Sequence, residues 1–151
     1  MSARTAEVVN DKDLAKAFTS VKPFIGAGQI TAMLASCYGE EGDSFVEKFK
    51  AIDSLISEMP VTYQQDGKGK DSVAHLHYFV GGCDWYITEK DMEGGVTQAY
   101  GYAVLNGDLE MAEFGYINIS ELLELGVELD LYFEPCTINA IVNKAELAET
   151  V

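Results

Sequence analysis

The stretch HLHYFVGGCDWYITEKD, residues 75–91, decides the fold that this sequence predicts. Apolar and polar residues alternate in its first part, a glycine pair follows, and an aromatic and β-branched run completes it. Alternation with a period of two is typical of a strand with one buried face, and a glycine pair is typical of a tight turn. Residues 75–91 therefore predict a β-hairpin that turns at Gly81 and Gly82.

A two-residue turn at these glycines fixes the pairing of the two strands. The pairs are then Val80 with Cys83, Phe79 with Asp84, Tyr78 with Trp85 and His77 with Tyr86. One face carries Leu76, Tyr78, Val80, Cys83, Trp85 and Ile87, and the other carries His75, His77, Phe79, Asp84, Tyr86 and Thr88. We expect the first face to pack on helices and the second, mixed face to be half-exposed. A bulge would shift these assignments by one residue.

Three helices are predicted before the hairpin. The first follows a cap at Asn10 and ends before Pro23, and the second covers residues 29–39. The third begins at a capping box of Ser44 and Glu47 and ends at Pro60. Its apolar residues recur at intervals of three and four, as in a helix with one buried face. The predicted core consists of Phe45, Phe49, Ile52, Ile56, Leu76, Trp85 and Ile87.

The chain after the hairpin alternates between strand and helix signals. The polar residues 64–71 predict a loop, and the Asn106–Gly107 pair predicts a second tight hairpin. Asn118 and Glu121 predict the start of a short helix that stops at Gly126. ELDLYF predicts a further strand, and residues 138–149 predict a terminal helix.

These segments together predict an α+β fold in a single domain, residues 1–151. Its sheet is an antiparallel meander of at least four strands, within residues 72–133. We expect the helices of residues 11–59 to pack on one face of this sheet, and a short helix and a C-terminal helix to complete the fold.

Charge is the most unusual bulk property of the chain. Ten Lys and Arg residues oppose 25 Asp and Glu residues, which gives a formal net charge of −15. Between Asp71 and Pro135 there are 13 acids and one base, Lys90. Such a field disfavours direct binding of nucleic acid and favours a basic protein partner. The alternative is that the charge serves solubility alone.

The sequence also favours a cytoplasmic protein. The polar N-terminus lacks the apolar run of a secretory signal, and no stretch approaches the length of a membrane-spanning helix. Cys37, Cys83 and Cys136 are widely spaced and odd in number, as is typical of reduced thiols. The oligomeric state is left open.

His75 and His77 raise the question of a metal or catalytic site. On one strand face they would lie roughly 7 Å apart, but the predicted register sends Cys83 to the opposite face and leaves Asp84 at the far end of the hairpin. We therefore expect no metal, no cofactor and no Cys–His nucleophilic pair. An enzyme would need His75, His77 and Tyr86 to line a pocket, with Asp84 or Glu113 as the nearby carboxylate.

A series of short segments resembles a known family. HYF, DWYITEKD, GYAVLNGD, EFGYINISEL and ELDLYFEP, in this order, are similar to the domain-of-unknown-function family numbered 2958. The resemblance covers residues 72–137, and Asn118 stands where the family has serine. It implies a setting in plasmids, integrative elements and phages, and it carries over no catalytic residues.

The leading hypothesis is therefore an accessory protein of a mobile genetic element that acts by binding another protein. The expected partner is basic, such as a nucleic-acid-handling host defence protein, and the expected binding residues are Glu110, Glu113, Glu121 and Glu124. The alternative is a small-molecule- or metal-binding enzyme that uses the strand face of His75, His77, Asp84 and Tyr86. A scaffold that only self-associates is the third possibility.

Overall fold

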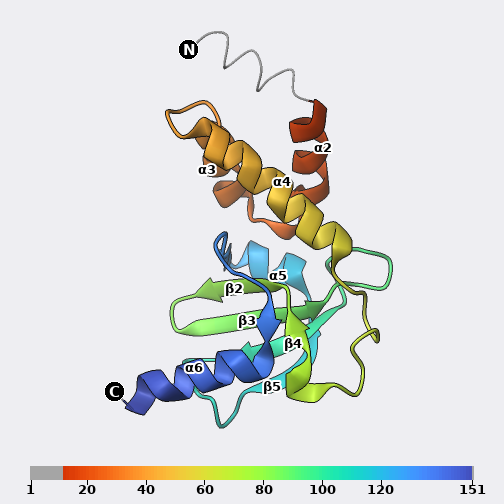
Figure 1. The fold of residues 1–151 in the computed structure, drawn as a ribbon, viewed down its shortest axis with the longest axis vertical. Coiled ribbons are helices and arrows are strands. Elements are labelled where there is room, and N and C mark those ends of the chain that lie inside the picture. The colour runs from red at the N-terminus through yellow and green to blue at the C-terminus, as the bar shows by residue number, and fades with distance from the viewer. Residues whose placement is uncertain (1–11, 151) are drawn as a thin grey trace. The chain divides into compact units, whose positions relative to one another are not determined.

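The computed structural model describes residues 12–150, which form a helical unit up to Glu58 and a sheet unit from Met59 (Figure 1). The predicted α+β class is confirmed, because an antiparallel five-stranded sheet follows the N-terminal helices and precedes a C-terminal helix. Each unit is described by itself. The packing of residues 11–59 on the sheet, and the single domain of residues 1–151, stay predictions.

The helical unit consists of α2 (Lys12–Val21), the 3-10 helix η1 (Lys22–Phe24), α3 (Ala27–Ser36) and α4 (Gly42–Glu58). α2 packs on α4, where the rings of Phe18 and Phe49 lie 6.3 Å apart. Pro23 follows the end of α2 as predicted, while the predicted cap at Asn10 lies outside the described residues. The predicted capping box is wrong. A turn that joins Gly42 N–H to the carbonyl of Gly39 leads directly into α4, so Ser44 lies inside the helix.

The first helix of the sheet unit is the 3-10 helix η2 (Gly69–Asp71). Its strands are β1 (Val73–Ala74), β2 (Leu76–Val80), β3 (Cys83–Glu89), β4 (Ala99–Val104), β5 (Glu113–Ile117), β6 (Glu128–Leu129) and β7 (Cys136–Thr137), and its helices are α5 (Ile119–Glu124) and α6 (Ile138–Thr150). The main sheet has the order β5-β4-β3-β2-β6, and β1 pairs with β7 separately. The chain therefore makes a four-strand meander and then crosses to the opposite edge to add β6.

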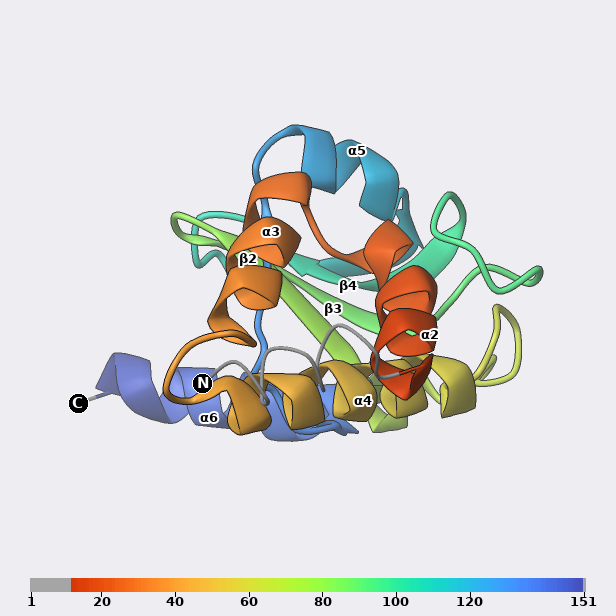
Figure 2. The same cartoon turned by 90° about the horizontal axis from the view of Figure 1, so that it is seen from above.

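The predicted register of the β2–β3 hairpin is confirmed at every pair, with His77 opposite Tyr86 and Tyr78 opposite Trp85. Cross-strand partners share a face, so the sheet has a Trp85 face and a His77 face. α5 lies on the Trp85 face and α6 on the His77 face (Figure 2). The second face is therefore less exposed than expected, because α6 buries Tyr102 and Val104 there.

The caps of α5 follow the sequence prediction. The side-chain oxygen of Asn118 accepts a hydrogen bond from the N–H of Glu121 at 3.3 Å. At the other end, Gly126 has φ 84°, Gly126 N–H donates to the carbonyl of Leu123, and Val127 N–H donates to that of Leu122. This pair of bonds is the Schellman motif, which ends a helix at a glycine in the left-handed region.

Two strands are shorter than predicted, and an aspartate explains each case. Asn106 and Gly107 have the positive φ of a tight turn, but pairing resumes only at Glu113, opposite Ala103. Between Gly107 and Glu113, the carboxylate of Asp108 accepts hydrogen bonds from the backbone N–H groups of Glu110 and Met111 and holds a turn. β6 ends in the same way at Asp130. Such side-chain bonds compete with the pairing of strands.

The predicted core is confirmed at Phe49, Ile52, Ile56, Leu76 and Ile87, which are all buried. The other two predicted residues, Phe45 and Trp85, are half-buried. Trp85 is partly exposed because it borders a shallow groove between the sheet and α5.

Gly101 on β4 has no room for a side chain beside the backbone of β3, and this generates a prediction for stability. A Cβ at this position would overlap the carbonyl oxygen of Tyr86. We expect Gly101→Ala to lower the free energy of unfolding by about 1–3 kcal/mol, because the strands must shift apart. Urea unfolding followed by circular dichroism measures this change.

Gly115 provides the matched control, since it is the cross-strand partner of Gly101 and a Cβ there would meet nothing within 4 Å. Gly115→Ala should change the free energy of unfolding by less than about 1 kcal/mol. Equal unfolding midpoints for the two variants would contradict the close approach.

Candidate functional site

His77 is the centre of a polar cluster on its face of the sheet. The hairpin register places it opposite Tyr86, and the two rings stack at 4.5 Å with an interplanar angle of 7°. The rings of Phe79 and Phe133 lie 5.7 and 5.6 Å away. The side chain of His77 is 14% exposed, so aromatic rings shield the imidazole from most of the solvent.

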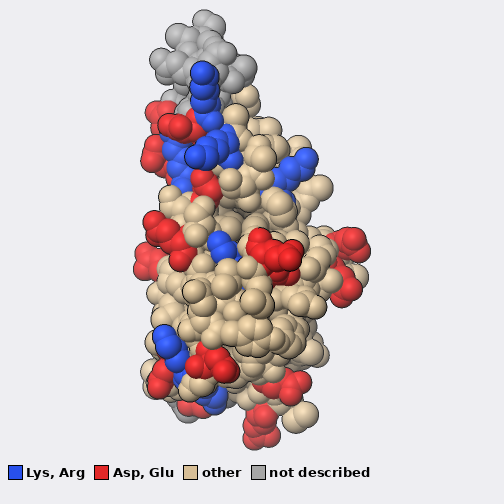
Figure 3. Space-filling model, turned by 90° about the vertical axis from the view of Figure 1, so that its right-hand side faces the viewer, with Lys and Arg blue, Asp and Glu red and all other residues tan. Residues whose placement is uncertain are grey.

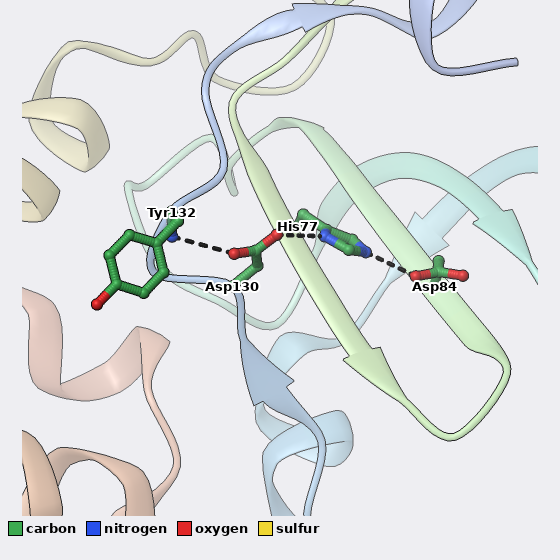
Figure 4. Close-up of polar contacts among 4 residues, drawn as sticks. All are labelled: His77, Asp84, Asp130 and Tyr132. Atoms are coloured by element: carbon green, nitrogen blue, oxygen red, sulfur yellow. Dashed lines mark hydrogen bonds and ion pairs between the residues drawn. The ribbon is translucent and has the colours of Figure 1, made fainter. Parts of the chain in front are cut away.

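Two carboxylates hold the imidazole of His77 from opposite sides (Figure 4). Nε2 lies 2.7 Å from Oδ1 of Asp84 on β3, and Nδ1 lies 3.0 Å from Oδ2 of Asp130, which follows β6. Asp130 is itself fixed, because its backbone N–H donates to the carbonyl of His77 and its Oδ1 accepts from the N–H of Tyr132. The cluster thus joins β2 and β3 to the segment that follows β6.

This geometry restricts what His77 can do chemically. Both ring nitrogens are engaged, so neither is open to a substrate or an ion unless a carboxylate moves away. Among residues 12–150, no group of three or more His, Cys, Asp or Glu side chains is arranged to hold a metal ion. The cluster thus presents two partly exposed carboxylates, one on each side of a hydrogen-bonded imidazole.

A groove of about 720 Å³ runs beside the cluster, between the segment after β6 and α6. His77, Tyr86 and Asp130 line it together with Phe133, Cys136 and Lys144. Burial raises the pKa of the Cys136 thiol, which disfavours the nucleophilic thiolate. Burial, with Asp84, Cys136 and Asp130 as further causes, raises the pKa of Tyr86 to about 12, so its phenol keeps its proton at neutral pH.

The structure brings together three of the four residues predicted for the alternative site, namely His77, Asp84 and Tyr86. His75 does not line the groove. It lies between β1 and β2, where its backbone N–H donates to the carbonyl of Ile87. Burial lowers the pKa of His75.

The four predicted partner-binding glutamates are all exposed, but only two of them line the same groove. Glu113 on β5 and Glu121 on α5 line one shallow groove. Glu110 lies in the loop after β4, Glu124 lies on α5, and neither lines that groove. On the face drawn in Figure 3, Lys and Arg gather over the helical unit, while the acids of the sheet unit form separate groups among uncharged residues.

The sequence pattern of ELDLYF predicts a continuous strand and gives Asp130 no place in the site, whereas β6 ends at Leu129. The available signal was Asp130 itself, because an aspartate side chain commonly accepts a hydrogen bond from the backbone N–H two residues later and so forms a local turn. Here that N–H belongs to Tyr132. Sequence reasoning also missed the contribution of α6 to the groove. No pattern within residues 138–149 indicates which face of the sheet this helix covers.

Comparisons with known protein families, with curated proteins and with solved structures found no match to this chain. The resemblance to the family numbered 2958 accordingly stays a prediction. Within residues 12–150, no helix combines the length and the apolar character needed to cross a membrane.

The His77 cluster predicts a coupled loss of stability. We expect His77→Gln to lower the free energy of unfolding by about 1–3 kcal/mol, because two partly buried carboxylates lose the imidazole. In the His77→Gln variant, Asp84→Asn should lower the free energy of unfolding by less than it does in the wild type. The coupling energy should be about 0.5–3 kcal/mol. A double-mutant cycle in urea measures both, and Glu128→Gln, which alters an exposed acid on β6, is the control. Additive losses would rule out the coupling.

His75 predicts part of the acid sensitivity of the fold. Its pKa is lowered in the folded state, so the unfolded state takes up the proton first as the pH falls below about 6.5. Stability should therefore decrease with falling pH in this range, and His75→Gln should reduce that decrease. Urea midpoints at neutral and mildly acidic pH test this, and an unchanged pH dependence in the variant would contradict it.

Proposed function

We propose that this chain binds a basic segment of another protein in the groove between β5 and α5. This α5–β5 groove has a volume of about 290 Å³. Its lining residues are Trp85, Gly101, Ala103, Glu113, Phe114, Gly115, Tyr116, Ile117, Asn118, Glu121, Leu122 and Leu125. A shallow apolar groove with carboxylates at its border suits a protein segment better than an enclosed small molecule.

The observation that carries this proposal is the combination of exposed apolar and acidic side chains along one groove. Leu125 is 78% exposed and Tyr116 is 59% exposed, although both are large apolar or aromatic residues. Glu113 and Glu121 border the same surface, and no Lys or Arg lines it. Apolar contact can supply affinity, while the carboxylates select a partner with Lys or Arg residues.

The net charge of the sheet region supports a basic partner. With 13 acids and one base between Asp71 and Pro135, the region would attract a positively charged segment and speed its association. The resemblance to the family numbered 2958 adds the mobile-element setting to this proposal. A nucleic-acid-handling host defence protein is then the proposed partner, because such proteins carry basic surfaces.

The test is a pull-down from bacterial lysate with the wild type and three variants, followed by binding measurements on the purified partner. We expect Glu113→Gln/Glu121→Gln and Leu125→Ser each to weaken binding at least about tenfold, since they remove the charge and the apolar contact of one groove. Higher salt should weaken binding of the wild type and have less effect on the Glu113→Gln/Glu121→Gln variant.

Glu93→Gln/Glu128→Gln is the matched control, because it makes the same change in net charge at exposed acids that do not line the groove. It should bind as the wild type does. If both double variants lose binding equally, net charge and not the groove determines the interaction. If the partner binds every variant as tightly as it binds the wild type, the proposal is refuted.

A further inference from the structure

A separate cavity of about 520 Å³ lies between the loop after α4 and the His77 face of the sheet. We call it the Glu89 pocket, and it is lined by Thr62, Tyr63, Gln65, Asp66, Gly67, Gly69, Ser72, Glu89, Tyr100, Phe114 and Tyr116. Its lining contains two carboxylates and four aromatic rings, and no Lys or Arg. Its walls therefore combine negative charge with aromatic surface.

A β-bulge directs Glu89 into this pocket. Simple alternation along β3 would place Glu89 on the Trp85 face with Ile87. The pairing of β3 with β4 instead shifts between these residues, so Ile87 lies opposite Gly101 and Glu89 lies opposite Tyr100. Thr88 is the extra residue, and its hydroxyl donates to the carbonyl of Tyr100. A bulge reverses the face of the residue that follows it.

Glu89 is 4% exposed, which is rare for a carboxylate. Its Oε2 accepts a hydrogen bond from the backbone N–H of Gln65 at 2.8 Å, and its Oε1 has no hydrogen-bond partner within residues 12–150. A buried carboxylate is costly unless it is paired with a positive charge or fully hydrogen-bonded. Glu89 lines the cavity, so a cationic group bound there would lie beside this carboxylate.

The loop that closes the pocket is held in place by Gln65. Its side-chain Nε2 donates to the carbonyls of Thr88 and Val73, and its Oε1 accepts from the N–H of Val73. In this loop Tyr63 has φ 79°, in the left-handed region that non-glycine residues rarely adopt. Its hydroxyl lies 2.7 Å from that of Tyr116. Strained backbone of this kind clusters at ligand sites.

The aromatic wall has a defined arrangement. The ring of Tyr100 meets that of Tyr116 edge-on at 5.5 Å and stacks on that of Phe114 at 6.1 Å. Aromatic faces attract organic cations, and quaternary ammonium groups are commonly held by several rings near a carboxylate. An inorganic ion would leave these rings without a function, and an anion would be repelled by Glu89.

We propose that the Glu89 pocket binds a small organic ammonium ion, with Glu89 as its counter-ion and Tyr63, Tyr100 and Tyr116 as its wall. The proposal does not depend on protein binding in the α5–β5 groove. Phe114 and Tyr116 line both sites, because β5 is the edge strand between them. Glu89 lines only the pocket, and Glu121 lines only the groove.

The probe is choline, compared with 3,3-dimethyl-1-butanol, a neutral molecule of nearly the same shape. Isothermal titration calorimetry and two-dimensional NMR of the full chain measure binding and its location. We expect choline to bind and to shift resonances of residues around Glu89, and we expect the neutral analogue to bind at least about tenfold more weakly. Absence of choline binding, or equal binding of the two molecules, would overturn the proposal.

The decisive variant is Glu89→Gln, which keeps an acceptor for the N–H of Gln65 and removes the charge. It should lose at least about tenfold in choline affinity, since the ammonium loses its buried partner. Tyr100→Leu should also weaken binding while leaving Glu89 in place, and it keeps the test open if Glu89→Gln does not fold. Glu128→Gln and Glu113→Gln/Glu121→Gln should bind choline as the wild type does. Unchanged affinity in Glu89→Gln or in Tyr100→Leu would refute the site.

Discussion

The sheet unit depends on the two-residue turn at Gly81 and Gly82, because this turn fixes which residues of β2 and β3 face each other. His77 meets the ring of Tyr86, and Asp84 comes within 2.7 Å of the imidazole, only in this register. A slip by one residue would move every side chain of one strand to the other face. The Trp85 face would then lose its apolar residues, and the His77 cluster would not form.

One departure from this regular pairing creates the second site. The extra residue at Thr88 reverses the alternation of β3, so a residue that would lie beside Ile87 enters a cavity on the opposite face. The same strand thus carries a structural cluster near its start and a buried carboxylate at its end. The two candidate binding regions, the α5–β5 groove and the Glu89 pocket, then lie on either side of the edge strand β5.

Features encoded by neighbouring residues could be predicted from the sequence, and features that depend on distant contacts could not. Alternation and the glycine pair predicted the hairpin register, and Asn118 and Gly126 predicted both ends of α5. The ends of β6 and of the hairpin at Asn106 could not be foreseen, because the turns at Asp130 and Asp108 compete with strand pairing. The hairpin register puts His77, Asp84 and Tyr86 on one face, and the structure brings these three together without His75. Asp130 joins them only through the crossover to β6, and the bulge at Thr88 directs Glu89 into its pocket.

The strand order β5-β4-β3-β2-β6 also imposes a sequence of events on folding. The meander closes through connections between successive strands, whereas β6 must return to β2, and the bond between His77 and Asp130 spans 53 residues. Such non-local closure carries a larger entropy loss and slows folding. During synthesis, β2 to β5 leave the ribosome before residues 128–130 can reach the outer edge of β2. Until then this edge offers unpaired backbone groups to other chains, and the pairing of Glu128 and Leu129 with Phe79 and Tyr78 ends that exposure.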